Sequence, residues 1–171
     1  MACYRFLIEG RQPERGFDLS RLTAQEIYKF LRDQIRLILV PFQEALHKGV
    51  SLYFVLEFEL ARPRWYWFDE KLIQQSVQYR VTYSPLTRQY RITSGLLGQQ
   101  LDSLEEVERQ LSRVVSRPVA QLDQLTKGAR YDAAVRLRLD VTLLPKPFQI
   151  NALASKDWSL QSDWYHWGFT P

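Results

Sequence analysis

The sequence contains very few of the residues that most often build metal sites and disulfides. It has one cysteine, Cys3, and two histidines, His47 and His166, which lie far apart along the chain. A single cysteine excludes an intramolecular disulfide, and no H-E-x-x-H pattern or cysteine pair offers the ligand spacing of a zinc site. No acidic segment resembles a calcium-binding loop. We therefore expect no metal and no other cofactor.

Long apolar runs and blocks of like charge are also missing. No stretch approaches the roughly 18 apolar residues of a membrane-spanning helix, and residues 1–16 lack the apolar core of a signal peptide. The net charge is +4, but basic residues alternate with acidic ones along the chain. We expect a mixed charged surface rather than a nucleic-acid footprint, with no transmembrane segment and no signal peptide.

Aromatic residues, in contrast, are abundant. They make up 13% of the 171 residues and include five tryptophans, which argues against disorder over most of the length. No internal repeat and no low-complexity linker divides the chain. We expect an irregular N-terminal segment over residues 1–25 and a single β-rich domain over residues 26–171.

Alternation of apolar and polar residues predicts at least four strands. The clearest covers Val50–Leu60, and the others cover Gln75–Tyr83, Gln89–Thr93 and Ala129–Val141. Ser84-Pro85-Leu86-Thr87 is typical of a turn, so the second and third strands form a hairpin. The expected fold class is α+β, mainly antiparallel β, as a single curved sheet or a β-sandwich with two short-to-medium helices.

The segment before the first strand has an ambiguous pattern. Ile27, Leu31 and Ile35 recur at helical spacing, while Gln34–Val40 also alternates as a strand would. Pro41 suits the first turn of a helix, because its missing N–H would have no partner there. We therefore expect a helix, then a possible strand over Gln34–Val40, then a short helix from Pro41 to a glycine stop at Gly49.

A second helix is predicted after residue 103. Ser103-Leu104-Glu105-Glu106 matches a capping box, in which the serine and the glutamate satisfy free N–H groups at the helix start. Apolar residues continue at helical spacing to Val114, and Pro118 ends the helix. Glu105, Glu108 and Arg109 are expected to face water. The close pair Gly95 and Gly98 lacks the context of a phosphate-binding loop and is expected to lie in a loop.

Two aromatic and basic clusters, Arg62–Phe68 and Trp158–Trp167, are candidates for a binding surface. If exposed, they would form an interaction patch of the Trp, Tyr and Arg type; if buried against each other, they would only close the core. Both interpretations stay open. The candidate surface residues, which also include two arginines near the hairpin turn, are Arg62, Arg64, Trp65, Tyr66, Trp67, Arg88, Arg91, Trp164 and Trp167.

Two alternatives belong to other functional classes. A hydrolytic enzyme would use Asp69, Glu70, Asp140 or His166, and requires a pocket that gathers two of them. Neighbouring residues of a strand point to opposite faces, so Asp69 and Glu70 do not converge, and His166 is expected to pack beside aromatics. A binder of nucleic acid or anionic lipid would use dispersed arginines. We do not expect nucleic acid to be a partner of this protein. These arginines are Arg80, Arg91, Arg136 and Arg138.

Several segments in consistent order resemble an uncharacterised family, domain of unknown function 4390. The matching segments, which cover roughly residues 34–169, are Glu44–Leu46, Gly49–Val50, Pro63–Glu70, Tyr79–Arg91, Arg138–Asp140, Leu144–Gln149 and Asp157–Leu160. The resemblance implies a proteobacterial protein that is periplasmic or envelope-associated, with a partner such as a sensor kinase of the envelope. It supplies no catalytic residues. The leading hypothesis is thus a non-catalytic binding or accessory protein of the bacterial cell envelope.

Overall fold

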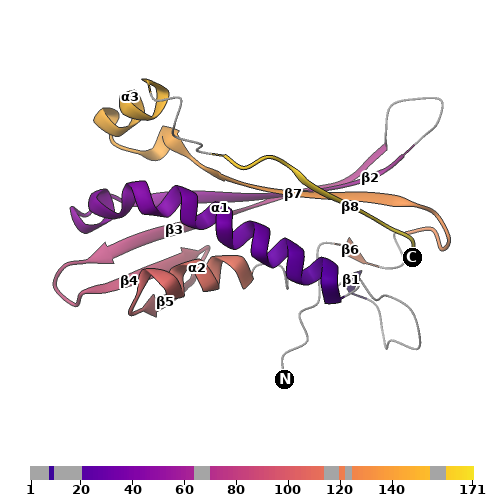
Figure 1. Cartoon of the computed structure of the whole chain (residues 1–171), viewed down its shortest axis with the longest axis horizontal. Coiled ribbons are helices and arrows are strands. Elements are labelled where there is room, and N and C mark those ends of the chain that lie inside the picture. Colours follow the sequence, from indigo (N-terminus) through magenta and orange to yellow (C-terminus); the bar gives the residue numbers. More distant parts are fainter. Residues whose placement is uncertain (1–7, 10–20, 64–69, 114–119, 122–124, 155–160) are drawn as a thin grey trace.

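Six strands form one open antiparallel sheet, and a long helix crosses one of its faces (Figure 1). The computed structural model describes residues 8–9, 21–63, 70–113, 120–121, 125–154 and 161–171. The strand order is β5-β4-β3-β2-β7-β8. These strands are β2 (Leu52–Arg62), β3 (Glu70–Ser84), β4 (Gln89–Ser94), β5 (Leu97–Leu101), β7 (Tyr131–Leu139) and β8 (Tyr165–Phe169).

The remaining elements lie around this sheet. The two-residue strands β1 (Ile8–Glu9) and β6 (Ala120–Gln121) pair in parallel with each other and not with the sheet. The helices are α1 (Arg21–His47), α2 (Leu104–Ser112), α3 (Lys146–Ala154) and the 3-10 helix η3 (Val141–Leu143). No described helix is long and apolar enough to cross a membrane.

The predicted α+β fold with mainly antiparallel strands is confirmed, and the sheet is a single open layer rather than a sandwich. The four predicted strands correspond to β2, β3, β4 and β7. The strands β5 and β8 and the helix α3 were not predicted. Gly95–Gly98, expected to be a loop, contains a turn and the beginning of β5.

The helix α1 runs without interruption through the segment whose pattern was ambiguous. The predicted strand over Gln34–Val40 is therefore wrong, and so is the predicted helix start at Pro41, which lies inside α1. Residues 21–25, assigned to the irregular N-terminal segment, form the first turns. The reason is a continuous stripe of buried residues on one side of the helix: Ile27, Leu31, Ile35, Ile38, Leu39, Phe42, Ala45 and Leu46.

The C-terminal end of α1 was predicted correctly. Gly49 adopts φ +88°, in the left-handed region that glycine enters without steric cost. Its N–H donates to the Leu46 carbonyl at 2.9 Å, and the Val50 N–H donates to the Ala45 carbonyl at 3.0 Å. This Schellman arrangement satisfies two carbonyls at the helix end and turns the chain into β2.

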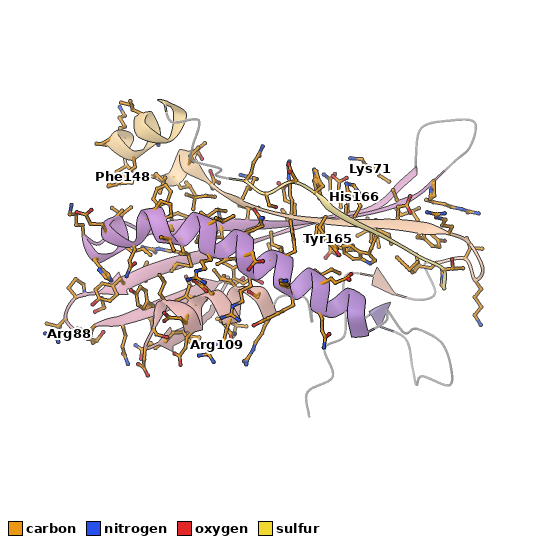
Figure 2. All side chains as sticks on the ribbon, in the orientation of Figure 1. Lys71, Arg88, Arg109, Phe148, Tyr165 and His166 are labelled. Atoms are coloured by element: carbon orange, nitrogen blue, oxygen red, sulfur yellow. The ribbon has the colours of Figure 1, made fainter. Side chains whose placement is uncertain are left out.

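The main core lies between α1 and the sheet. On β2 and β7 every second side chain points towards α1, in the alternating burial that the sequence pattern predicts. A smaller cluster around Phe58, Leu60 and Tyr131 continues the core towards the other end of these strands. Phe148 of α3 packs at the edge of the main core, as Figure 2 shows. We call the sheet side that faces α1 the inner face and the opposite side the outer face.

The helix α2 begins as predicted, but one of its residues is placed differently. The Ser103 hydroxyl accepts the Glu106 N–H at 3.2 Å, and the Glu106 carboxylate accepts the Asp102 N–H at 2.9 Å. Glu108, expected to face water, is only 5% exposed because α2 packs against α1. Its carboxylate lies 4.0 Å from Nε of Arg32, and burial raises its pKa.

Candidate functional site

The outer face of the sheet collects four arginines that are dispersed in the sequence. The register pairs Arg80 with Tyr53, Arg138 with Val55 and Arg136 with Glu57. It also pairs Arg91 with Thr82 on the neighbouring strands β4 and β3. All these residues alternate with the buried positions of their strands, so their side chains share the face opposite α1. The arginines therefore lie on one surface that extends from β4 to β7.

Glu57 lies between Arg136 and Arg138, at the β7 end of this surface. Its carboxylate accepts a hydrogen bond from Nε of Arg138 at 3.0 Å and another from Nε of Arg136. Burial by itself raises the pKa of Glu57, but the two guanidinium groups outweigh it and lower the pKa below its usual value. One carboxylate thus orients two cations, and the trio keeps a net positive charge.

Aromatic rings hold two of the arginines in place. The guanidinium of Arg136 lies 4.6 Å from the centroid of the Trp164 ring, and that of Arg80 lies 5.8 Å from the centroid of the Tyr53 ring. Arg80 also donates to the Ser51 hydroxyl at 3.0 Å. These contacts restrict the rotamers of long side chains, which reduces the entropy that a partner must overcome when it binds them.

The outer face continues beyond the arginines towards the end of β2 that carries Arg62. Lys71 pairs with Glu59 at 3.1 Å, and Gln74 donates to the same carboxylate at 3.0 Å. His166, opposite Ala134 in the register, is exposed here, on the same face as Trp164. In Figure 2, Lys71 and His166 lie above the ribbon of β7 and β8, while Tyr165 lies below it.

The structure separates Trp164 and Trp167 of the predicted second cluster, and the third tryptophan of that cluster, Trp158, lies outside the described residues. Trp164 lies under Arg136 on the outer face. Trp167 pairs with Ala133 on the inner face, where its ring centroid lies 6.1 Å from that of Phe58. Trp164 therefore contributes to the outer face and Trp167 to the packing of the core.

The other predicted surface residues are partly described. Arg62 is exposed at the end of β2, and Arg91 is exposed within the arginine surface. Arg88 is exposed at the tip of the β3–β4 hairpin, with φ of 55° (Figure 2). The remaining candidates of the first cluster lie outside the described residues: Arg64, Trp65, Tyr66 and Trp67.

A second polar cluster, unforeseen from the sequence, joins the end of α1 to the hairpin. Nε2 of His47 lies 2.9 Å from the Tyr90 hydroxyl, and its ring lies 4.4 Å from that of Tyr83. Burial raises the pKa of Tyr90, with the neighbouring Tyr83 adding to the effect. Because 43 residues separate His47 from Tyr90, only the folded chain reveals this pair. Its geometry suits a structural hydrogen bond between helix and sheet.

The carboxylates considered for hydrolysis do not converge among the described residues. Asp140 accepts hydrogen bonds from the N–H and the hydroxyl of Thr142 at the start of η3. His166 pairs with Ala134, and Ala134 lies six residues before Asp140 along the chain. The spacing of residues in a strand therefore separates His166 from Asp140 by roughly 20 Å. Glu70 pairs with Arg62 at the far end of the sheet, and Asp69 lies outside the described residues.

Comparison with known proteins agrees with the resemblance seen in the sequence. The model of one family, described as "Domain of unknown function (DUF4390)", matches residues 22–168. No curated protein and no solved structure gives a significant match. Within the described residues no group of three histidine, cysteine, aspartate or glutamate side chains could hold a metal ion. The family match spans most of the chain, with five strands of the sheet and all of β8 but its last residue, so the chain belongs to the DUF4390 family.

Proposed function

We propose that this chain is a non-catalytic binding protein of the bacterial cell envelope, whose outer sheet face binds an acidic segment of a protein partner. The observation that carries the proposal is the gathering of Arg80, Arg91, Arg136 and Arg138 on one face. The family resemblance is the basis for proposing a location in the cell envelope. The separation of Asp140, His166 and Glu70 is the basis for a role without catalysis.

The chemistry of the outer face suits carboxylates on a protein surface. A guanidinium offers a planar fork of donors that matches a carboxylate, and arginine, tyrosine and tryptophan are enriched where proteins bind each other. Arg80 and Arg91 are exposed, so their guanidinium groups are accessible to a partner. Around them lie uncharged hydrogen-bonding side chains that can pair with backbone amides: Gln78, Thr82, Thr93 and Gln100.

Nucleic acid and anionic lipid fit this face less well. Both present a dense array of phosphates, which favours cations without intervening carboxylates. Here Glu57, Glu59 and Asp132 lie on the same face as the arginines. Each would repel a phosphate placed above it. An acidic protein segment can instead align separate carboxylates with individual arginines.

A pull-down from a proteobacterial envelope extract tests the proposal. The wild-type chain is compared with the double variant Arg80→Gln and Arg91→Gln, and with the control Lys29→Gln and Lys127→Gln. The control removes the same charge from exposed positions outside the outer face. We expect a protein that the wild type and the control retain and that the double variant loses, with far-UV circular dichroism unchanged.

Two results would contradict the proposal. Equal retention of the partner by the double arginine variant would show that the outer face is not the binding surface. Binding of a single-stranded oligonucleotide or of anionic vesicles through the four arginines, with a roughly 10²-fold loss of affinity between 50 and 200 mM salt, would favour a phosphate-bearing partner. Acidic protein contacts at a few arginines predict a much shallower dependence on salt.

A further inference from the structure

The strand β5 forms an edge of the sheet that nothing covers within the described residues. It pairs with β4 on one side only, and the strand order ends there. Its sequence, Leu97-Gly98-Gln99-Gln100-Leu101, contains no charge and no proline. Natural edge strands are usually blunted by charges, prolines or bulges, because their free N–H and C=O groups pair readily with another strand. This edge carries none of these protections.

The hairpin geometry identifies the backbone groups that face outward. The β4–β5 turn consists of Gly95 and Leu96, with Gly95 at φ +59°, and Ser94 pairs with Leu97 across it. A two-residue turn is closed by a hydrogen-bonded pair, and such pairs alternate along an antiparallel ladder. Leu97, Gln99 and Leu101 therefore bond to β4. The N–H and C=O groups of Gly98 and Gln100 point away from the sheet.

We propose that β5 pairs with β5 of a second copy of this chain, antiparallel about a two-fold axis at Gln99. In this register Gly98 of each copy forms a hydrogen-bonded pair with Gln100 of the other. Leu97 of each copy lies opposite Leu101 of the other on the inner face. No cross-strand pair brings like charges together, so the strand is complementary to itself.

The exposure of Leu97 supports this register. Its side chain is 74% exposed although it lies on the inner face, in line with Leu101, which is 7% exposed. The second copy would cover Leu97 with an apolar neighbour at the same level of the sheet. The opposite edge, β8, shows no such residue: Tyr165 packs on Phe30 with ring centroids 5.1 Å apart, and Phe169 stacks on Tyr131.

The charges of α2 fit the same two-fold axis. This helix packs over β4 and β5, next to the free edge (Figure 1). Its exposed residues run from acidic to basic, with Glu105 in the first turn and Arg109 and Arg113 towards the end. The axis reverses the direction of the second α2, which brings the acidic end of each helix to the basic end of the other. A parallel partner would oppose like charges instead.

A dimer of this kind would give the protein a larger binding surface than the outer face proposed for one copy. It would join two six-stranded sheets into one continuous sheet, and the outer faces of both copies would form a single surface. A partner with two acidic segments could then bind both arginine surfaces at once, with a gain in avidity. The inference itself does not require the arginine surface to bind anything.

The first test compares the mass of the wild type in solution with that of two variants by sedimentation equilibrium. Gln100→Pro removes an outward N–H without removing a bond to β4, and Leu97→Lys places a cation opposite the apolar Leu101 of the other copy. We expect the wild type to be a dimer and both variants to be monomers with unchanged far-UV circular dichroism. A monomeric wild type at its highest soluble concentration, or dimeric variants, would overturn the proposal.

Cross-linking provides a second readout that does not depend on the stability of those variants. In a Cys3→Ser background, Gln99→Cys places one thiol at the proposed axis, where facing Cβ atoms lie about 5 Å apart. We expect a disulfide-linked dimer under mild oxidation, and none for the control Gln74→Cys on the outer face. Failure of Gln99→Cys to cross-link, or capture at β5 of an extended segment from another protein in place of a second copy, would contradict self-pairing.

Discussion

Glu57 and Glu108 show how the surroundings of one residue type decide its effect on stability. Glu57 is held by Arg136 and Arg138, and its pKa is lowered. Glu108 is buried between two helices, and burial outweighs the attraction of Arg36 and Arg32, so its pKa is raised. The two residues therefore contribute to the pH dependence of folding with opposite signs.

Replacement of Glu108 by glutamine should raise the free energy of unfolding, relative to that of the wild type, more at neutral pH than at acidic pH. A carboxyl whose pKa is raised by folding contributes stability that is present below its unfolded pKa and lost as the pH rises through the folded value. The Glu108→Gln variant lacks this loss. Urea unfolding at pH 5 and pH 7 should therefore show that the free energy of unfolding of the variant, minus that of the wild type, increases as the pH rises. An advantage of the variant that is greater at pH 5 would contradict the raised pKa.

Replacement of Glu57 by glutamine should have the opposite pH dependence. A carboxyl with a lowered pKa stabilises the fold above its unfolded pKa, and this contribution is lost as the pH falls through the folded value. We expect Glu57→Gln to reduce the free energy of unfolding by about 1–3 kcal/mol at pH 7, because Arg136 and Arg138 lose their charged acceptor. The difference from wild type should shrink towards pH 3. A constant difference across this range would rule out the lowered pKa.

At the scale of elements, α1 is the helix whose course the sequence left undecided. The sequence is compatible with Pro41 as the first residue of a helix and as a residue within one. Only the surroundings decide whether a carbonyl four residues earlier requires the N–H that proline lacks. In the fold the preceding turn contains Leu37, which is 61% exposed. The carbonyl of Leu37 has no N–H to accept from Pro41, and the solvent side of the helix lets water take that place.

Replacement of Pro41 by alanine distinguishes a continuous helix from a helix that starts there. Within a continuous helix the new N–H bonds to the Leu37 carbonyl, and we expect the free energy of unfolding to rise by about 1–3 kcal/mol. At a helix start the same change would bring no gain. Chemical denaturation measures the difference, with Pro85→Ala in the β3–β4 turn as a control that should not stabilise the fold.

The element boundaries that the sequence predicted well rely on local chemistry. Gly49 ends α1 and Ser103 caps α2, because a left-handed glycine and a capping hydroxyl act on backbone groups within a few residues. The strand β5 was missed because its five residues show no clear alternation and four of them are exposed. Its pairing with β4 follows from the turn at Gly95 and Leu96, whose effect needs the preceding strand.

At the scale of the whole molecule, stability depends on the contact between α1 and the sheet. The open sheet has one buried face, on which α1 and α2 pack (Figure 1), with Phe148 of α3 at the edge of the core. Phe42 lies in this contact and is 1% exposed. The smaller cluster around Phe58, Leu60 and Tyr131 lies further along the strands and does not cover a defect in this contact.

Replacement of Phe42 by alanine should therefore destabilise the entire fold. We expect a loss of about 3–5 kcal/mol, which is a large fraction of the 5–15 kcal/mol typical of a domain. The control Gln78→Ala, exposed on the outer face, should change the free energy of unfolding by about 0.5 kcal/mol or less. Thermal unfolding followed by circular dichroism gives both values. A small effect of Phe42→Ala would mean that α1 contributes little to the core.

The candidate site was predictable only in its parts. The sequence offered Arg91 and Trp164 as candidate surface residues, and alternation put Arg136 and Arg138 on one face of a strand. It gave no reason for Arg80 and Arg91 to lie beside them. It treated Trp164 and Trp167 alike, although the register places them on opposite faces. Position within a strand decides the face, and the register of β8 against β7 depends on packing between segments about 30 residues apart.

The sequence alone determined the features whose causes are local or periodic. Alternation over β2 and β7, the cap at Ser103 and the stop at Gly49 were all readable because each depends on neighbouring residues. Tertiary structure decided the single layer, the continuity of α1, the burial of Glu108 and the gathering of the outer-face arginines. Each of these depends on which surfaces meet after the chain folds. The free energy of those tertiary contacts cannot be read from the order of residues along the sequence.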